Sequence, residues 1–123
     1  MVNNPLPSRM ARILSADLLE ITMTLGPPGD PDVFVTAADD VVEVSAAAEL
    51  ARRITLIDEA GDLIRGPLAV LEFDAPAKEV ASPIRRSDPG FTGRGRTAGG
   101  AREFVIANYR ISELDNVHTR VIR

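Results

Sequence analysis

The feature that most limits the possible folds of this chain is an alternating pattern over residues 42–57. Every second residue from Val42 to Leu56 forms one set, and seven of its eight members are apolar, against three of eight in the set between them. Because successive side chains of a β-strand point to opposite faces, this pattern predicts one long half-buried strand, or two collinear ones. The acidic turn around Gly61 then reverses the chain, which predicts a hairpin over 54–64.

A helix is the competing interpretation of the same stretch. Residues 45–51 have high helix propensity, and Ser45 is a fair N-cap. A helical stripe would have Arg53 in its middle, whereas the strand places Arg52 among apolar residues, so each interpretation buries one arginine. We expect strand throughout, and therefore a larger loss of stability from Arg52→Ala than from Arg53→Ala. The alternative is a short helix at 45–51 that leads into a strand at 52–57.

Similar patterns predict further strands on both sides of this stretch. Apolar residues alternate with polar ones or form short runs bounded by turn residues at 13–25, 33–36, 68–73, 104–111 and 117–122. Six or seven short strands separated by turn signals, with little firm helix, are typical of an all-β or mainly β fold. The sequence therefore predicts a small β-barrel or β-sandwich.

Length and composition limit the organisation of the chain. With 123 residues, 45% of them apolar, it has the size and core of one domain. We expect a flexible N-terminal arm at 1–9, which contains Pro5 and Pro7, and a single β-domain at 10–123. The sequence has no cysteine and a net charge of −4, so we expect no disulfide or thiolate metal site and consider nucleic acid an unlikely partner. No apolar run is long enough to cross a bilayer and no signal peptide is visible, so a soluble, non-secreted protein with no membrane partner is expected.

The hydrophobic pattern disappears over residues 74–102, which are rich in Pro, Gly, Ser and Arg. A loop of this length inside a compact domain is usually functional or disordered. From residue 85 onward its five arginines are accompanied by a single acid, Asp88, so this segment is a basic flap on an acidic protein. We predict that the flap contacts a partner protein through its arginines, with nucleic acid as a less favoured partner and plain flexibility as the alternative. The predicted partner-binding residues are Arg85, Arg86, Arg94, Arg96 and Arg102.

No catalytic, cofactor or metal motif is readable in the sequence. His118 is the only histidine, and no Ser or Asp is tied to it by spacing, so an exposed histidine at a strand end is the simpler interpretation. The acids near Asp30 and Asp58 do not have the spacing of a calcium loop. The Gly-rich residues 90–96 neither follow a strand directly nor open a helix, which excludes the usual phosphate-binding motifs. We expect no enzyme, no cofactor, no metal and no small-molecule substrate. An enzyme would need acid and base groups that converge only in the fold.

Two parts of the chain carry a resemblance to a known group of proteins. The matching residues are Val42, Val44, 46–48, Arg52, Arg53, 54–58, 61–63 and 109–113. With a valine-rich strand, small residues, paired arginines, an acidic Gly turn and a strand that ends in Tyr-Arg-Ile-Ser-Glu, they resemble the β-rich N-terminal domain of minor tail or baseplate-hub-type proteins of actinobacterial siphophages. The resemblance covers about forty residues and its motifs are structural. This chain departs from the pattern in its long Arg/Gly loop.

The resemblance implies a non-enzymatic structural subunit of a phage virion, in the tail, baseplate or connector. Such a subunit would form homo-oligomers, bind other virion proteins, and assemble in the bacterial cytoplasm. Neighbouring subunits would cover its sheet edges, and its arm and loop would become ordered on docking. The alternatives are a β-barrel module that binds a ligand or partner, a capsid decoration protein, and a small enzyme without a readable motif. Few aromatic residues are present to line a pocket, which disfavours the ligand-binding module.

Overall fold

The computed structural model describes residues 7–26, 28–54, 56, 60, 62–76 and 101–123. Within them the chain is mainly β, which confirms the predicted fold class, with one α-helix and three short 3-10 turns. The elements are β1 (Arg9–Ser15), η1 (Ala16–Leu18), β2 (Asp32–Ala37), η2 (Ala38–Asp40), α1 (Ala47–Ile54), β3 (Leu68–Asp74), β4 (Glu103–Ala107), η3 (Ile111–Glu113) and β5 (His118–Ile122).

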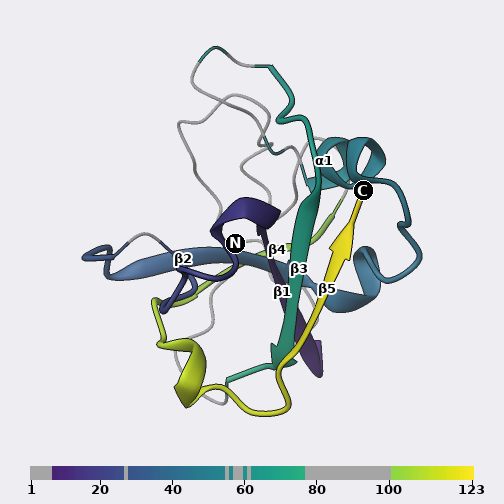
Figure 1. Ribbon diagram of the computed structural model, residues 1–123. Coiled ribbons are helices and arrows are strands. Elements are labelled where there is room, and N and C mark those ends of the chain that lie inside the picture. The colour runs from purple at the N-terminus through teal and green to yellow at the C-terminus, as the bar shows by residue number, and fades with distance from the viewer. Residues whose placement is uncertain (1–6, 27, 55, 57–59, 61, 77–100) are drawn as a thin grey trace.

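The strands form one antiparallel sheet with the order β4-β2-β1-β3-β5 (Figure 1). In the described part of the chain β4 and β5 are its two edges, so the sheet is not closed into a barrel. The central pair, β1 and β3, is joined over seven residue pairs, whereas β1 and β2 are joined over two. Beyond that short contact β2 runs across the direction of β3 and β5 (Figure 1). The sheet is therefore strongly twisted, as short antiparallel strands usually are.

Each face of the sheet buries its own apolar cluster. One face, here called the helix face, packs beneath η2 and α1, and its buried residues include Ala11, Ile13, Leu68, Val70, Ile122, Val41, Val44 and Leu50. The opposite face, here called the loop face, packs against residues 19–25 and 109–117, and its buried residues include Met10, Val33, Val35, Leu71, Phe73, Phe104 and Ile106. Within β1 and β3, neighbouring residues alternate between the two clusters, so these strands are covered on both faces.

The predicted long strand at 42–57 is wrong, and the helical alternative describes the chain better. Residues 47–54 form α1, whose buried side chains are Ala47, Leu50 and Ala51, with Ile54 partly buried. These positions follow the i, i+3, i+4, i+7 spacing of a helix that covers a sheet. Glu49 in the first turn and two arginines in the last turn also suit the helix dipole. Leu56 accepts a hydrogen bond from the Ile64 N–H at 2.9 Å, so the chain does reverse there, but Gly61 lies outside the described residues.

The strand predicted from Ile13 to Leu25 is correct only at its beginning. It ends at Ser15, and η1 and a turn follow, with an isolated bridge between Thr24 and Arg110. Side chains that the alternation would have buried are exposed, with Ile21 at 74% and Met23 at 77% of their full surface. The backbone of residues 23–25 bonds to residues 109–111 instead of entering the sheet.

The remaining predicted strands are present as β2, β3, β4 and β5, although β4 ends earlier than expected, at Ala107. Most of the predicted arm and of the basic flap, residues 1–6 and 77–100, lies outside the described part of the chain.

Candidate functional site

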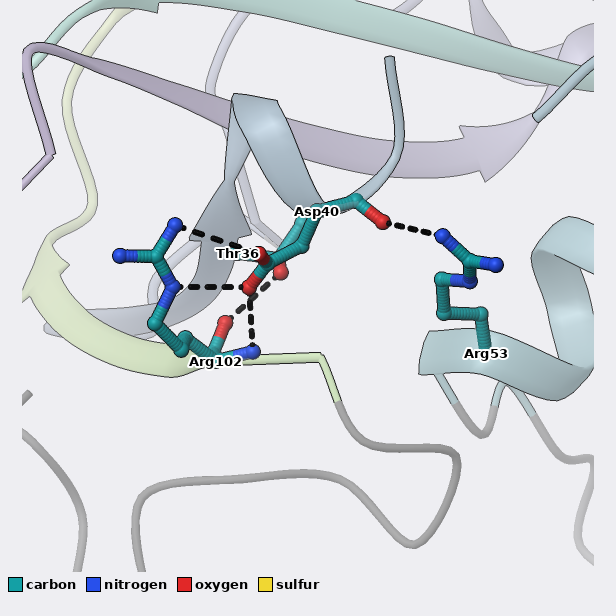
Figure 2. A network of polar contacts seen from close by, with 4 residues as sticks. All are labelled: Thr36, Asp40, Arg53 and Arg102. Carbon is teal, nitrogen blue, oxygen red and sulfur yellow. Dashed lines mark hydrogen bonds and ion pairs between the residues drawn. The ribbon is translucent and has the colours of Figure 1, made fainter. Parts of the chain in front are cut away.

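A network of polar contacts joins η2, α1 and the residue that precedes β4 (Figure 2). The Asp40 carboxylate accepts hydrogen bonds from the Arg102 backbone N–H at 2.7 Å, from its Nε at 3.0 Å and from its Nη2 at 3.2 Å. Thr36 Oγ1 donates to the Arg102 carbonyl oxygen at 2.7 Å, and Arg53 Nη1 donates to the Asp40 carbonyl oxygen at 3.0 Å. We call Thr36, Asp40, Arg53 and Arg102 the Asp40 clamp.

The Asp40 clamp fixes the start of β4 against the segment that follows β2. The side chains of Arg102 and Asp40 are only 18% and 22% exposed to solvent, so their ion pair is partly shielded from water. The hydrogen bond to Asp40 raises the pKa of Arg102, which stays charged in any case. Because the guanidinium and the backbone N–H of one residue bind the same carboxylate, the clamp orients Arg102 strictly.

The clamp reverses the expected ranking of the two neighbouring arginines. Arg53 donates a hydrogen bond to the Asp40 carbonyl, and its Nη2 lies 3.6 Å from Glu49 Oε1. Arg52, in contrast, is exposed. We expect Arg53→Ala to lower the free energy of unfolding by about 1 kcal/mol and Arg52→Ala to change it by less than about 0.5 kcal/mol. Urea titration of both variants measures the difference. A larger loss for Arg52→Ala would contradict the helical placement of both residues.

A second polar cluster ties the ends of β1 and β3 to the turn before β5. Arg9 Nη1 donates to Asp74 Oδ1 at 2.8 Å and Arg9 Nη2 to the Asn116 carbonyl at 2.8 Å. Asn116 Nδ2 donates to Asp74 Oδ2 at 2.6 Å, and Asn116 itself has a positive φ of 51°, a conformation that asparagine tolerates well. The three side chains therefore hold one another in place at this end of the sheet.

Asp74 has a lowered pKa in this cluster. The hydrogen bond from Asn116 is the main cause of the lowered pKa, partial desolvation opposes it, and Arg9 adds to it. The folded state thus favours the ionised carboxylate. Its contribution to stability is fully present above the ordinary pKa of 3.8 and is lost as the pH falls through the lower folded value.

The strand register places four polar side chains, two on each side of Ala11, in one row across the helix face. His118 pairs with Glu72, Glu72 with Ala11, Ala11 with Thr36, and Thr36 with Glu103. Residues directly opposite one another on antiparallel strands share a face, so the row crosses all five strands. Thr36 and Glu103 are buried, at 6% and 5% exposure, Glu72 is half-buried and His118 is exposed. The open end of the row, at His118 and Glu72, is therefore the part that solvent and a ligand can reach.

Of the predicted partner-binding residues, Arg102 is the one that the structure describes. Its guanidinium pairs with Asp40 of the same chain. The other four, Arg85, Arg86, Arg94 and Arg96, lie outside the described residues, so binding of a partner by this set stays a prediction.

Two other arginines that the sequence did not single out bind backbone carbonyls. Arg12 donates to the carbonyls of Leu25 and Phe34, at 3.0 and 3.1 Å, and so occupies the place where β1 and β2 diverge. Arg120 donates to the carbonyls of Val41 and Val44, at 3.0 and 3.3 Å, and joins β5 to the segment before α1. For Arg12 the sequence offered a signal, because an arginine among the apolar residues of a strand must find acceptors. Arg120 follows two polar residues in β5, so the sequence offered no such signal there.

Further searches of the described residues add two facts. No group of three or more His, Cys, Asp or Glu in that part of the chain is arranged to hold a metal ion. None of the helices described is long and apolar enough to cross a membrane.

Comparison with known proteins gives a match to a family model. Neither the curated proteins nor the solved structures contain a significant match to this chain. The family model of Ntox10, described as novel toxin 10, matches residues 1–123. Since this match covers the whole sequence given, the chain belongs to the Ntox10 family of novel toxins.

Proposed function

We propose that this chain is a toxin domain that stops the growth of a cell in which it is present. The observation that carries the proposal is the match of the toxin family model to residues 1–123. The matched residues include those of the Asp40 clamp and of the polar row on the helix face.

The structure supports such a role in one physical respect. The chain contains no cysteine, and its described part is held by two apolar clusters and by arginines that bind carbonyls or carboxylates. A fold of this kind needs no oxidising compartment in order to form. A toxin domain without disulfides can therefore fold in the reducing interior of the cell that it harms.

The test is expression of the chain from a tightly repressed, inducible promoter in a laboratory bacterium. We expect growth to stop after induction, and to continue in cells that carry the same gene with an early stop codon. Ile21→Ala, at a side chain that is 74% exposed, serves as a control substitution that should remain toxic. Normal growth despite soluble, folded protein would contradict the proposal.

A structural subunit of a virion, the role expected from the sequence, is the second candidate. It is favoured by the two edge strands of the described sheet, β4 and β5, which neighbouring subunits could cover. For this role we expect a defined oligomer in solution, measured as the mass of the purified protein, and no effect on growth. A harmless oligomer would thus favour this candidate, and a toxic protein would favour the first.

A further inference from the structure

Glu72 and His118 occupy directly opposite positions on β3 and β5. In an antiparallel pair the Cβ atoms of such residues lie about 4.5 to 5.5 Å apart, and both side chains stand on the same face. His118 is exposed and Glu72 half-buried, and no ion pair joins them in the structure. The chain's single histidine therefore stands beside a carboxylate, with both groups available to a ligand.

The surroundings of this pair are well fixed. The next residues along the strands on the same face, Arg9 and Asp74, are held with Asn116 by hydrogen bonds of 2.6 to 2.8 Å. The side chain of Arg9 keeps 28% of its exposure, so its positive charge remains close to solvent. β5 begins at the end of the sheet away from α1 (Figure 1), so the helix does not cover this pair. A rigid strand pair is a better support for acid–base groups than a loop.

We propose that Glu72 and His118 form an acid–base site that cleaves RNA by internal transesterification. The inference rests on the proposed toxin function and names its substrate. The 2′-oxygen of a ribose forms a bond to the adjacent phosphorus while the bond from phosphorus to the 5′-oxygen breaks. Glu72 accepts the proton of the 2′-hydroxyl, and the His118 imidazolium gives a proton to the departing 5′-oxygen. The products are a 2′,3′-cyclic phosphate and a 5′-hydroxyl, and the step consumes no other reagent.

The choice of RNA follows from the residues that are available. A carboxylate accepts a proton and an imidazolium donates one, and a ribose supplies its own nucleophile in the 2′-hydroxyl. Arg9 stands on the same face as the pair, diagonally across from Glu72, and its bonds to Asp74 and to the Asn116 carbonyl hold its positive charge there. A nearby positive charge favours the phosphate, which becomes more negative during the reaction. The net charge of −4 disfavours a broad nucleic-acid surface, but a site of this size needs to hold only one phosphate.

The experiment incubates the purified chain with a short RNA, with the same sequence as DNA, and with RNA methylated at every 2′-oxygen. We expect cleavage of the unmodified RNA alone, with cyclic phosphate and 5′-hydroxyl ends identified by mass spectrometry. Glu72→Gln and His118→Asn should each slow cleavage by about 100-fold or more. Glu43→Gln, an exposed carboxylate elsewhere, and Thr119→Asn, the next residue of β5 on the other face, should cleave at the normal rate. Circular dichroism and thermal melting show that each variant is folded.

The outcomes separate this inference from the proposed function. A protein that stops growth but leaves RNA intact overturns the inference and leaves the toxin proposal standing. Cleavage of RNA without growth arrest overturns the toxin proposal and leaves the RNA-cleaving site standing. Cleavage of the DNA or of the methylated RNA overturns the internal mechanism. An unchanged rate in folded Glu72→Gln or His118→Asn shows that the site is elsewhere or that a contaminating nuclease is responsible.

Discussion

The Leu50→Ala variant is expected to lose about 2 to 5 kcal/mol of unfolding free energy. Leu50 is 0% exposed and lies at the centre of the buried stripe of α1, within the cluster on the helix face. Its truncation removes apolar contacts and leaves a cavity that a short helix over a rigid sheet fills poorly. Because a domain of this size has a total stability of about 5 to 15 kcal/mol, the variant should melt far below the parent protein. Thermal melting and urea titration measure the loss.

Val42→Ala is the matched control for this prediction. A continuous strand would bury Val42 on the same face as Leu50, but Val42 is 55% exposed in the structure. We therefore expect a loss below about 0.5 kcal/mol, as for most surface substitutions. Similar losses for both variants would mean that the strand prediction for 42–57 is correct after all.

The second large effect is expected for Asp40→Ala, at about 2 kcal/mol. The substitution removes a carboxylate that accepts three hydrogen bonds from Arg102. It leaves a partly shielded guanidinium and a backbone N–H without that acceptor, and the remaining exposure of the pair keeps the loss below that of a fully buried one. The start of β4 should also become less well held, because Arg102 directly precedes that strand.

Asp39→Ala is the control, because Asp39 is the exposed neighbour in the same 3-10 turn. It should change stability by less than about 0.5 kcal/mol. Hydrogen exchange of the amides of β4 provides a local measure, since exchange should accelerate in Asp40→Ala and stay normal in Asp39→Ala. Equal effects of both substitutions would show that net charge matters here and that the clamp does not.

The sequence was sufficient for those strands whose side chains have a single interpretation. β2 and β3 contain β-branched and large apolar residues between clear turn signals, and both lie where the pattern predicts them. Residues 42–57 were ambiguous because an alternating set and a helical stripe share Leu50 and Ile54. High helix propensity and a sheet face that needed a cover favoured the helix, and this requirement of the tertiary structure is not visible in a local pattern.

The candidate site could not be predicted from the sequence, for a different reason. Glu72 and His118 become neighbours only because β5 pairs with β3, and spacing along the chain does not reveal which strands pair. The Asp40 clamp likewise depends on the pairing of β2 with β4. The number of arginines in the predicted flap favoured a partner-binding role. The one that the structure describes, Arg102, pairs with Asp40 of its own chain.

The position of β1 at the centre of the sheet has a consequence for the order in which the chain can fold. Among the described strands β1 comes first in the sequence, yet its most extensive partner is β3, and the edge strands β4 and β5 come last. Closing so long a loop before the seven β1–β3 residue pairs can form makes folding slow, on the order of milliseconds to seconds for proteins dominated by distant contacts. A chain that emerges from the ribosome with its N-terminus first can therefore form only the two-residue contact between β1 and β2 until β3 has emerged.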